Sequence, residues 1–211
     1  EKNMKENFEK IEREYFKFNN TDLERINYEL SKITEPTLIS DVSGSSVVAE
    51  YASKILNKKN NIITRRVEPR DFKYLNLIGY KNVLSCSYSG NNYGVELAFL
   101  NDMKHYLLAE KNETEGTINL TYSCDDKEHS FILLASTLIT CSILLNYYLG
   151  SNKKIIIDNT GSYNYNLDVN CTAYEIFSGL ETSSASKFLE STMFESGIGL
   201  PIIHDKYSYC H

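Results

Sequence analysis

The stretch that decides the fold runs from Lys81 to Met103 and reads KNVLSCSYSGNNYGVELAFLNDM. Its first six residues, KNVLSC, form a short apolar run typical of a buried strand, and residues 93–103, YGVELAFLNDM, have the period of an amphipathic helix. Residues 87–92 between them carry hydroxyl and amide side chains and a glycine, which predicts a turn. A strand, a polar turn and a helix in this order are the repeating unit of parallel sheets.

Strands and helices alternate on both sides of this stretch. The expected elements are a helix at 7–33, a strand at 37–42, a helix at 45–59, a strand at 61–67, a helix after Pro69, strands at 105–111 and 117–123, and a long apolar helix at 131–149. This alternation predicts an α/β fold, a three-layer sandwich in which helices cover both faces of a mostly parallel sheet.

Composition narrows the class of protein. The chain has 211 residues, 42% of them hydrophobic, so it can bury a core of one domain or of one domain and part of another. A net charge of -6 with no basic stripe argues against nucleic acid as a partner. The five cysteines are widely spaced without a C-x-x-C pair, which suggests neither a disulfide framework nor a zinc site. The N-terminal residues contain no apolar segment of a signal peptide, and we expect a cytoplasmic protein.

The apolar run FILLASTLITCSILLNYYL, residues 131–149, approaches the length of a membrane span. It contains five serine, threonine or asparagine side chains, which a lone span would leave facing lipid. We therefore expect a helix of the core or of a subunit interface, and no membrane partner.

Two turns are candidates for a ligand site, because ligands of parallel sheets bind at the carboxyl ends of the strands. One is DVSGSS, residues 41–46, and the other is the turn at 87–92. In each, a glycine allows close approach of the backbone, and serine hydroxyls and the N–H groups of a helix start can bind an anion. The alternative is that these residues only cap helices. Neither a P-loop nor a dinucleotide fingerprint is present in the sequence.

The two turns resemble those of the sugar isomerase (SIS) family of phosphosugar-binding domains. Gly44-Ser45-Ser46 is similar to its first G-[ST]-S turn, and residues 87–92 are similar to its S-x-S-G-x-T loop, with Asn92 at the usual threonine. The resemblance implies a flavodoxin-like SIS fold. It also implies that the second loop holds the phosphate of a sugar phosphate and that the first touches sugar hydroxyls. The implied binding residues are Gly44, Ser45, Ser46, Ser87, Tyr88, Ser89, Gly90 and Asn92.

The long helix carries a further similarity. Members of the SIS family start the corresponding helix with AST or with E-x-S-F, and both occur here, as Ala135-Ser136-Thr137 and as residues 128–131. The two imply different registers, and the first makes Ser136 a substrate-binding residue. The alternative is that these hydroxyls bond back to helix carbonyls.

The C-terminal part resembles the beginning. SGLETSSASKFL, residues 178–189, is similar to the stretch that starts at Ser43, and two-lobed SIS isomerases contain two such domains in tandem. We therefore divide the chain into a first SIS domain with an N-terminal helix, residues 1–165, and the start of an incomplete second SIS-like lobe, residues 166–211. This lobe is too short to close its own sheet. We therefore expect either that the protein is longer or that a partner subunit completes the fold.

The resemblance also implies catalytic residues in the second lobe. Isomerases of the family have a glutamate at the end of that lobe's first helix and a histidine sixteen residues later, and Glu195 and His211 have this spacing. Moving a carbonyl between neighbouring sugar carbons requires a base such as a carboxylate, and histidine suits ring opening. The alternative is that both residues lie on the surface without a catalytic role. No metal or cofactor is implied.

The predicted function is a phosphosugar aldose-ketose isomerase, or a fructosamine-phosphate deglycase, that uses a glutamate base. The alternative is a SIS module that binds a sugar phosphate as a sensor and does no chemistry. Both take a phosphorylated sugar or amino sugar as ligand. The resemblance implies a homodimer or a higher oligomer, because in the family the histidine of one subunit often reaches the site of another.

Overall fold

A computed structural model describes residues 20–41, 43–98, 102–110, 113–123, 134–150, 172–197 and 199–209. Predicted helix 7–33 is therefore described only from Asn20 onward. The elements of the main body are α2 (Asn20–Ser31), β1 (Thr37–Asp41), the 3-10 helix η1 (Ser43–Ser45), α3 (Ser46–Asn60), β2 (Thr64–Val67), the 3-10 helix η2 (Pro69–Tyr74), β3 (Asn82–Cys86), α4 (Tyr93–Ala98), β4 (Lys104–Glu110), β5 (Ile118–Tyr122) and α5 (Leu134–Leu149).

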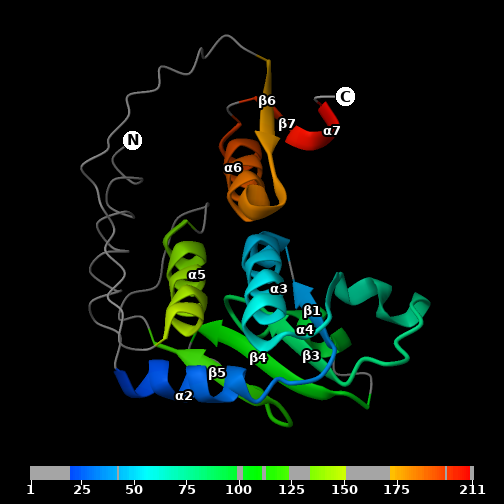
Figure 1. Cartoon of the computed structure of the whole chain (residues 1–211), viewed down its shortest axis with the longest axis vertical. Coiled ribbons are helices and arrows are strands. Elements are labelled where there is room, and N and C mark those ends of the chain that lie inside the picture. The colour runs from blue at the N-terminus through cyan, green and yellow to red at the C-terminus, as the bar shows by residue number, and fades with distance from the viewer. Residues whose placement is uncertain are drawn as a thin grey trace.

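Five strands form one sheet in the order β2-β1-β3-β4-β5, and every neighbouring pair is parallel. The predicted parallel sheet is confirmed, and its order is that of flavodoxin-like folds. Figure 1 shows the helices α2, α3 and α5 beside this sheet.

Successive side chains of the strands pack into two separate hydrophobic cores. Ile39, Leu84 and Leu108 pack with apolar residues of α2, α3 and α5, whereas Leu38 and Val83 pack with residues of η2 and α4. Because successive strand residues point to opposite faces, each strand serves both layers. This arrangement confirms the predicted three-layer sandwich.

The strand order reverses between β1 and β3. From β1 the chain crosses to β2 on one side, and from β2 it returns to β3 on the other side. The loops that leave the carboxyl ends of β1 and β3 therefore separate, and such a switch point leaves a crevice in which α/β proteins bind ligands.

Helix α5 packs in the core of the main body. Its residues Ile139, Ile143, Leu144 and Tyr147 belong to the core shared with α2 and α3. None of the helices in the described part of the chain combines the length and apolar character that crossing a bilayer requires.

Two helical segments are shorter than the sequence pattern suggests. The predicted helix after Pro69 is the six-residue 3-10 helix η2, which buries only Pro69 and Phe72. Predicted helix 93–103 is described as α4 to Ala98, residues 99–101 lie outside the described part, and Met103 lies directly before β4. Tertiary packing supplies most helical stability, so the length of a helix does not follow from the sequence period alone.

A second, smaller sheet follows in the chain. It consists of β6 (Ala173–Ser178) and β7 (Leu200–Asp205) in parallel, with η3 (Leu180–Thr182) and α6 (Ser183–Ser196) between them and α7 (Lys206–Tyr209) after them. The order strand, 3-10 helix, helix is the same as in β1, η1 and α3. Helix α6 contacts the main body through α3, where Oγ of Ser183 donates to Oε1 of Glu50 at 2.7 Å, and Lys54 donates to the carbonyl oxygen of Leu180 in η3 at 2.5 Å. The predicted boundary at residues 165 and 166 lies outside the described residues.

Candidate functional site

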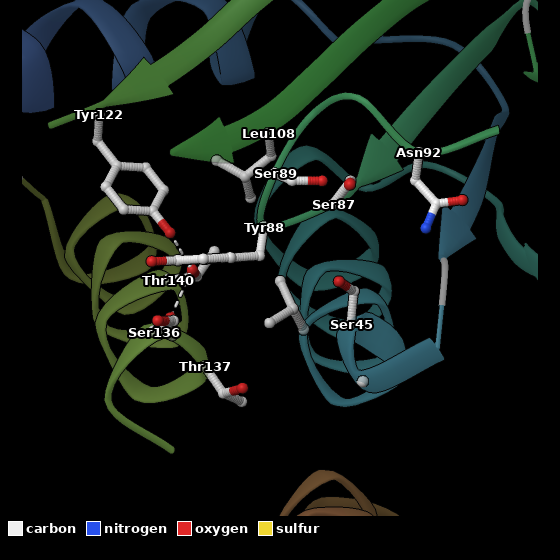
Figure 2. Close-up of a pocket in the computed structure, with 12 residues that line it drawn as sticks. Ser45, Ser87, Tyr88, Ser89, Asn92, Leu108, Tyr122, Ser136, Thr137 and Thr140 are labelled. Atoms are coloured by element: carbon white, nitrogen blue, oxygen red, sulfur yellow. Dashed lines mark hydrogen bonds between the residues drawn. The ribbon is translucent and has the colours of Figure 1, made fainter. Parts of the chain in front are cut away.

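A cavity of about 250 Å³ opens at the carboxyl ends of β1 and β3. Figure 2 shows its lining, which comes from the start of α3, the loop between β3 and α4, the ends of β4 and β5, and the first turns of α5. We call it the hydroxyl pocket. Its lining residues are Gly44, Ser45, Val48, Ser87, Tyr88, Ser89, Asn92, Leu108, Tyr122, Ser136, Thr137 and Thr140.

The loop from Ser87 to Asn92 holds itself in shape. The N–H of Gly90 donates to Oγ of Ser87 at 3.2 Å, and the N–H of Gly94 donates to Oδ1 of Asn92 at 3.0 Å. Gly90 has a φ of 69°, in the left-handed region that favours glycine. The glycine is therefore required by the turn itself.

The serine hydroxyls of this loop accept hydrogen bonds from its own backbone. In its bond to Gly90, the hydroxyl of Ser87 acts as acceptor and keeps its own hydrogen. Oγ of Ser89 accepts the N–H of Asn91 at 3.5 Å. The capping role of the alternative interpretation is filled by Asn92, which precedes α4 and accepts the N–H of Gly94.

The start of α3 forms a second wall of the hydroxyl pocket. Ser45, the residue before its first turn, makes no side-chain capping hydrogen bond to this fifteen-residue helix. A helix start carries N–H groups without intrahelical acceptors and a partial positive charge. A Cβ added at Gly44 would meet no atom within 4 Å, so the space beside this turn is open.

The third wall joins β5 to α5. Tyr122 and Thr140 lie with their hydroxyl oxygens 2.5 Å apart, and Oγ1 of Thr140 lies 2.8 Å from the carbonyl oxygen of Ser136. In Figure 2 the ring of Tyr88 extends from its loop toward this same helix. Hydroxyl groups therefore face the cavity from both the loop side and the α5 side.

Every residue that lines the hydroxyl pocket is neutral at physiological pH. Asp41, at the end of β1, is buried and forms an ion pair with Arg66 of β2. An anion in the pocket would thus be held by hydroxyl and N–H dipoles, as at other helix starts and glycine-containing turns.

Solved structures share this architecture, although no protein-family model and no curated protein sequence matches the chain. Glucosamine-6-phosphate deaminase from Thermotoga maritima superposes with a TM-score of 0.68 and 15% identity, over 100% of this chain and 72% of that chain. The C-terminal domain of glucosamine-fructose-6-phosphate aminotransferase from Francisella tularensis has a TM-score of 0.69 and 10% identity, over 99% and 71%. A candidate sugar-binding protein from Salmonella typhimurium LT2 has a TM-score of 0.62 and 12% identity, over 100% and 76%.

The chain has the SIS fold. The SIS resemblance seen in two short turns thus extends to the whole architecture. These similarities concern the fold, because the sequence identities are low.

Most of the predicted binding residues of the SIS fold come together in the hydroxyl pocket. Ser46 and Gly90 are the exceptions: Ser46 opens α3 and lines a neighbouring depression, and Gly90 is buried within its loop. Those that line the pocket are Gly44, Ser45, Ser87, Tyr88, Ser89, Asn92 and Ser136. Since Ser136 and Thr137 are both in the lining, the structure favours the register of Ala135-Ser136-Thr137, while residues 128–131 lie outside the described part.

Glu195 lies apart from the lining of the hydroxyl pocket. It is exposed near the end of α6, where Ser191 donates to its Oε1 at 3.2 Å. It lines a depression of about 390 Å³ together with Ser46, Lys187, Glu190, Ser191 and Phe194. Ser46 directly follows the pocket residues Gly44 and Ser45 in the chain. His211 lies outside the described residues.

Five pocket residues were not among the predicted binding residues, and one of them, Thr137, directly follows the predicted Ser136. Tyr122 ends strand β5, so the strand-end rule could have found it, and Thr140 lies one helical turn after Ser136. Val48 and Leu108 carry no signal that distinguishes them from core residues. Within the described ranges, no group of three or more histidine, cysteine or carboxylate side chains is placed to hold a metal ion.

Proposed function

We propose that this protein binds a phosphorylated sugar in the hydroxyl pocket. The observation that supports this most is the convergence of hydroxyl groups from three distant segments at the switch point of a parallel sheet. The hydroxyl pocket has a volume of about 250 Å³, close to the lower limit of roughly 300 Å³ for small-molecule sites. The names of two structural neighbours, a glucosamine-6-phosphate deaminase and an aminotransferase acting on fructose 6-phosphate, fit a ligand of this class.

The proposed orientation follows from the chemistry of the walls. The phosphate binds to the Ser87–Asn92 loop and faces the start of α3, where hydroxyl and N–H donors can surround its oxygens. The sugar extends toward Tyr122, Ser136 and Thr140, whose hydroxyls both donate and accept hydrogen bonds. Val48 and Leu108 offer apolar contact to its C–H groups.

Calorimetry tests the proposal on the full chain. Glucose 6-phosphate and glucosamine 6-phosphate should bind, and glucose should bind much more weakly because the phosphate contacts are absent. If neither hexose phosphate binds, or if glucose binds as well as its phosphate, the proposal is wrong.

A second candidate function is aldose-ketose isomerisation, or the related deglycation of a fructosamine phosphate. Its support is that Glu195 lines the same depression as Ser46, which follows the pocket residue Ser45 in the chain, together with the enzymes among the structural neighbours. In this proposal Glu195 takes a proton from one sugar carbon and returns it to the next. His211 would assist ring opening from a second copy in a cytoplasmic homodimer. Proton exchange at the sugar's C1 or C2 separates this candidate from binding alone.

A further inference from the structure

A groove of about 530 Å³ lies between η2 and α4, and the proposed function makes no use of it. Its floor is formed by Pro69 and Phe72, which are buried, and Phe72 packs in the core on the η2 and α4 face of the sheet. The hydroxyl pocket is lined instead by Val48 and Leu108, which belong to the core on the other face. This groove, which we call the aromatic groove, is therefore a separate hollow.

Two large aromatic side chains are exposed on the walls of the aromatic groove. Tyr74, at the end of η2, is 76% exposed, and Tyr93, at the start of α4, is 69% exposed. Exposed aromatic rings that gather at one hollow are typical of a binding surface, because each ring offers a flat apolar face to a ligand. The volume of the groove lies within the roughly 300–1,000 Å³ of small-molecule sites.

Arg70 and Lys73 give the aromatic groove a positive charge. Side chains three positions apart lie one above the other in a 3-10 helix, so η2 presents both cations on one side. Nζ of Lys73 lies 4.7 Å from the centroid of the Tyr74 ring, and neither cation forms an ion pair within the described part of the chain. The nearby carboxylates Glu68 and Asp71 line a different hollow. The charge of the groove therefore favours an anion.

We propose that the aromatic groove binds a nucleoside monophosphate. The base stacks on the rings of Tyr74 and Tyr93, since every nucleobase has a flat face that an aromatic side chain accepts. The phosphate binds to Arg70 and Lys73, because a guanidinium fork and an ammonium group complement its two negative charges. Such a site requires neither a P-loop nor a dinucleotide fingerprint. A nucleic acid strand would need a longer basic stripe, which the sequence lacks.

Calorimetry on the full chain tests this inference. The probes are adenosine 5′-monophosphate (AMP), uridine 5′-monophosphate (UMP) and adenosine, which has the base without the charge. The nucleotides should bind, and adenosine should bind about tenfold or more weakly than AMP. Tyr93→Ala should weaken AMP binding by about tenfold, the scale of one stacked base, whereas Tyr93→Phe keeps the ring and the affinity. Replacing both Arg70 and Lys73 by alanine should also weaken it by about tenfold or more. All three side chains are exposed, so the variants should fold as the wild type does.

Two controls accompany these variants. Tyr28→Ala is the matched control, because Tyr28 on α2 is 62% exposed and has Nζ of Lys32 at 3.9 Å from its ring centroid. The second control replaces Ser87 and Ser89 by alanine, since the phosphate of a nucleotide is also a potential ligand of the hydroxyl pocket. Both controls should bind AMP as the wild type does.

Each of the other outcomes overturns the inference. If neither nucleotide binds, or if adenosine binds as well as AMP, the groove does not select a nucleotide. If the groove variants keep their affinity, the nucleotide binds elsewhere, and a loss confined to the Ser87 and Ser89 variant places it in the hydroxyl pocket. If no nucleotide binds and Tyr93→Ala converts a dimer to a monomer in sedimentation, the groove is an interface between two copies of the chain. Hexose phosphate binding is measured separately, so the proposed function does not depend on these results.

Discussion

The hydroxyl oxygen of Tyr122 lies 2.5 Å from Oγ1 of Thr140, a residue eighteen positions later in the chain. Thr140 also lies 2.8 Å from the carbonyl oxygen of Ser136, to which it donates. Since threonine has a single hydroxyl hydrogen, Tyr122 is then the donor in the first bond. This pair ties the end of β5 to the first turns of α5, and both residues line the hydroxyl pocket.

Replacing Tyr122 by phenylalanine should destabilise the fold modestly. The change removes one buried hydrogen bond and leaves Thr140 with its bond to the Ser136 carbonyl, so the free energy of unfolding should fall by about 1 kcal/mol. Urea unfolding followed by circular dichroism measures it. The control is Tyr148→Phe at an exposed position of α5, which should leave the free energy of unfolding unchanged. Equal stability of the Tyr122→Phe variant and the wild type would show that this hydrogen bond does not stabilise the fold.

Replacing both Ser87 and Ser89 by alanine should remove most of the affinity for hexose phosphates. Each hydroxyl is expected to donate to the phosphate, and one such charge-assisted bond lost costs about tenfold or more. Calorimetry with glucose 6-phosphate provides the measurement. The control is Ser142→Ala, because Ser142 donates to the carbonyl of Leu138 and does not line the pocket. Unchanged binding by the double variant would show that the phosphate binds elsewhere.

The main sheet was predictable because turn residues separate its strands from the helices that follow them. Runs such as KNVLSC have a clear period and end at glycine or hydroxyl clusters, so the strands from β1 to β5 were placed to within a few residues. The segment after Pro69 was harder, because a proline at the start of a helix does not specify how far the helix continues. Its length depends on contacts that are distant in sequence.

The pocket residues that belong to a sequence motif were predictable. Those that tertiary packing brings to the pocket were not. Ser87 and Ser89 lie in a short pattern that the sequence displays directly. Tyr122 and Thr140 resemble ordinary strand and helix residues, and their position at the site follows only from strand register and helix packing. Glu195 has the spacing of a catalytic residue, yet spacing along a chain does not determine which hollow a side chain faces.

Two thiols, the buried Cys86 and the partly buried Cys141, should resist alkylation in the folded protein. Burial raises the pKa of the Cys141 thiol to about 12, and burial likewise raises the pKa of Cys86, next to the pocket loop. The thiolate is the reactive form of cysteine. With a pKa of about 12, only about one Cys141 thiol in ten thousand is ionised at pH 8, so alkylation should be slow. Iodoacetamide with peptide mass mapping should leave both cysteines unmodified at pH 8 and modify both in urea. Rapid labelling of either cysteine in the folded chain would contradict the raised pKa of its thiol.

Glu195→Gln separates an enzyme from a binding protein. The amide keeps the shape of the side chain and can still accept from Ser191, but it cannot take a proton from carbon. If Glu195 is the base, hexose phosphates should bind as before, while solvent deuterium exchange at C1 or C2 falls by ~10²-fold or more. Glu190→Gln is the matched control, because Glu190 lines the same depression on the same helix. The assay requires the complete protein in its natural oligomeric state, so that a histidine from a second copy can take part. A wild type that binds hexose phosphates and exchanges no proton on any of them would rule out isomerisation, and the function would then be sugar-phosphate sensing.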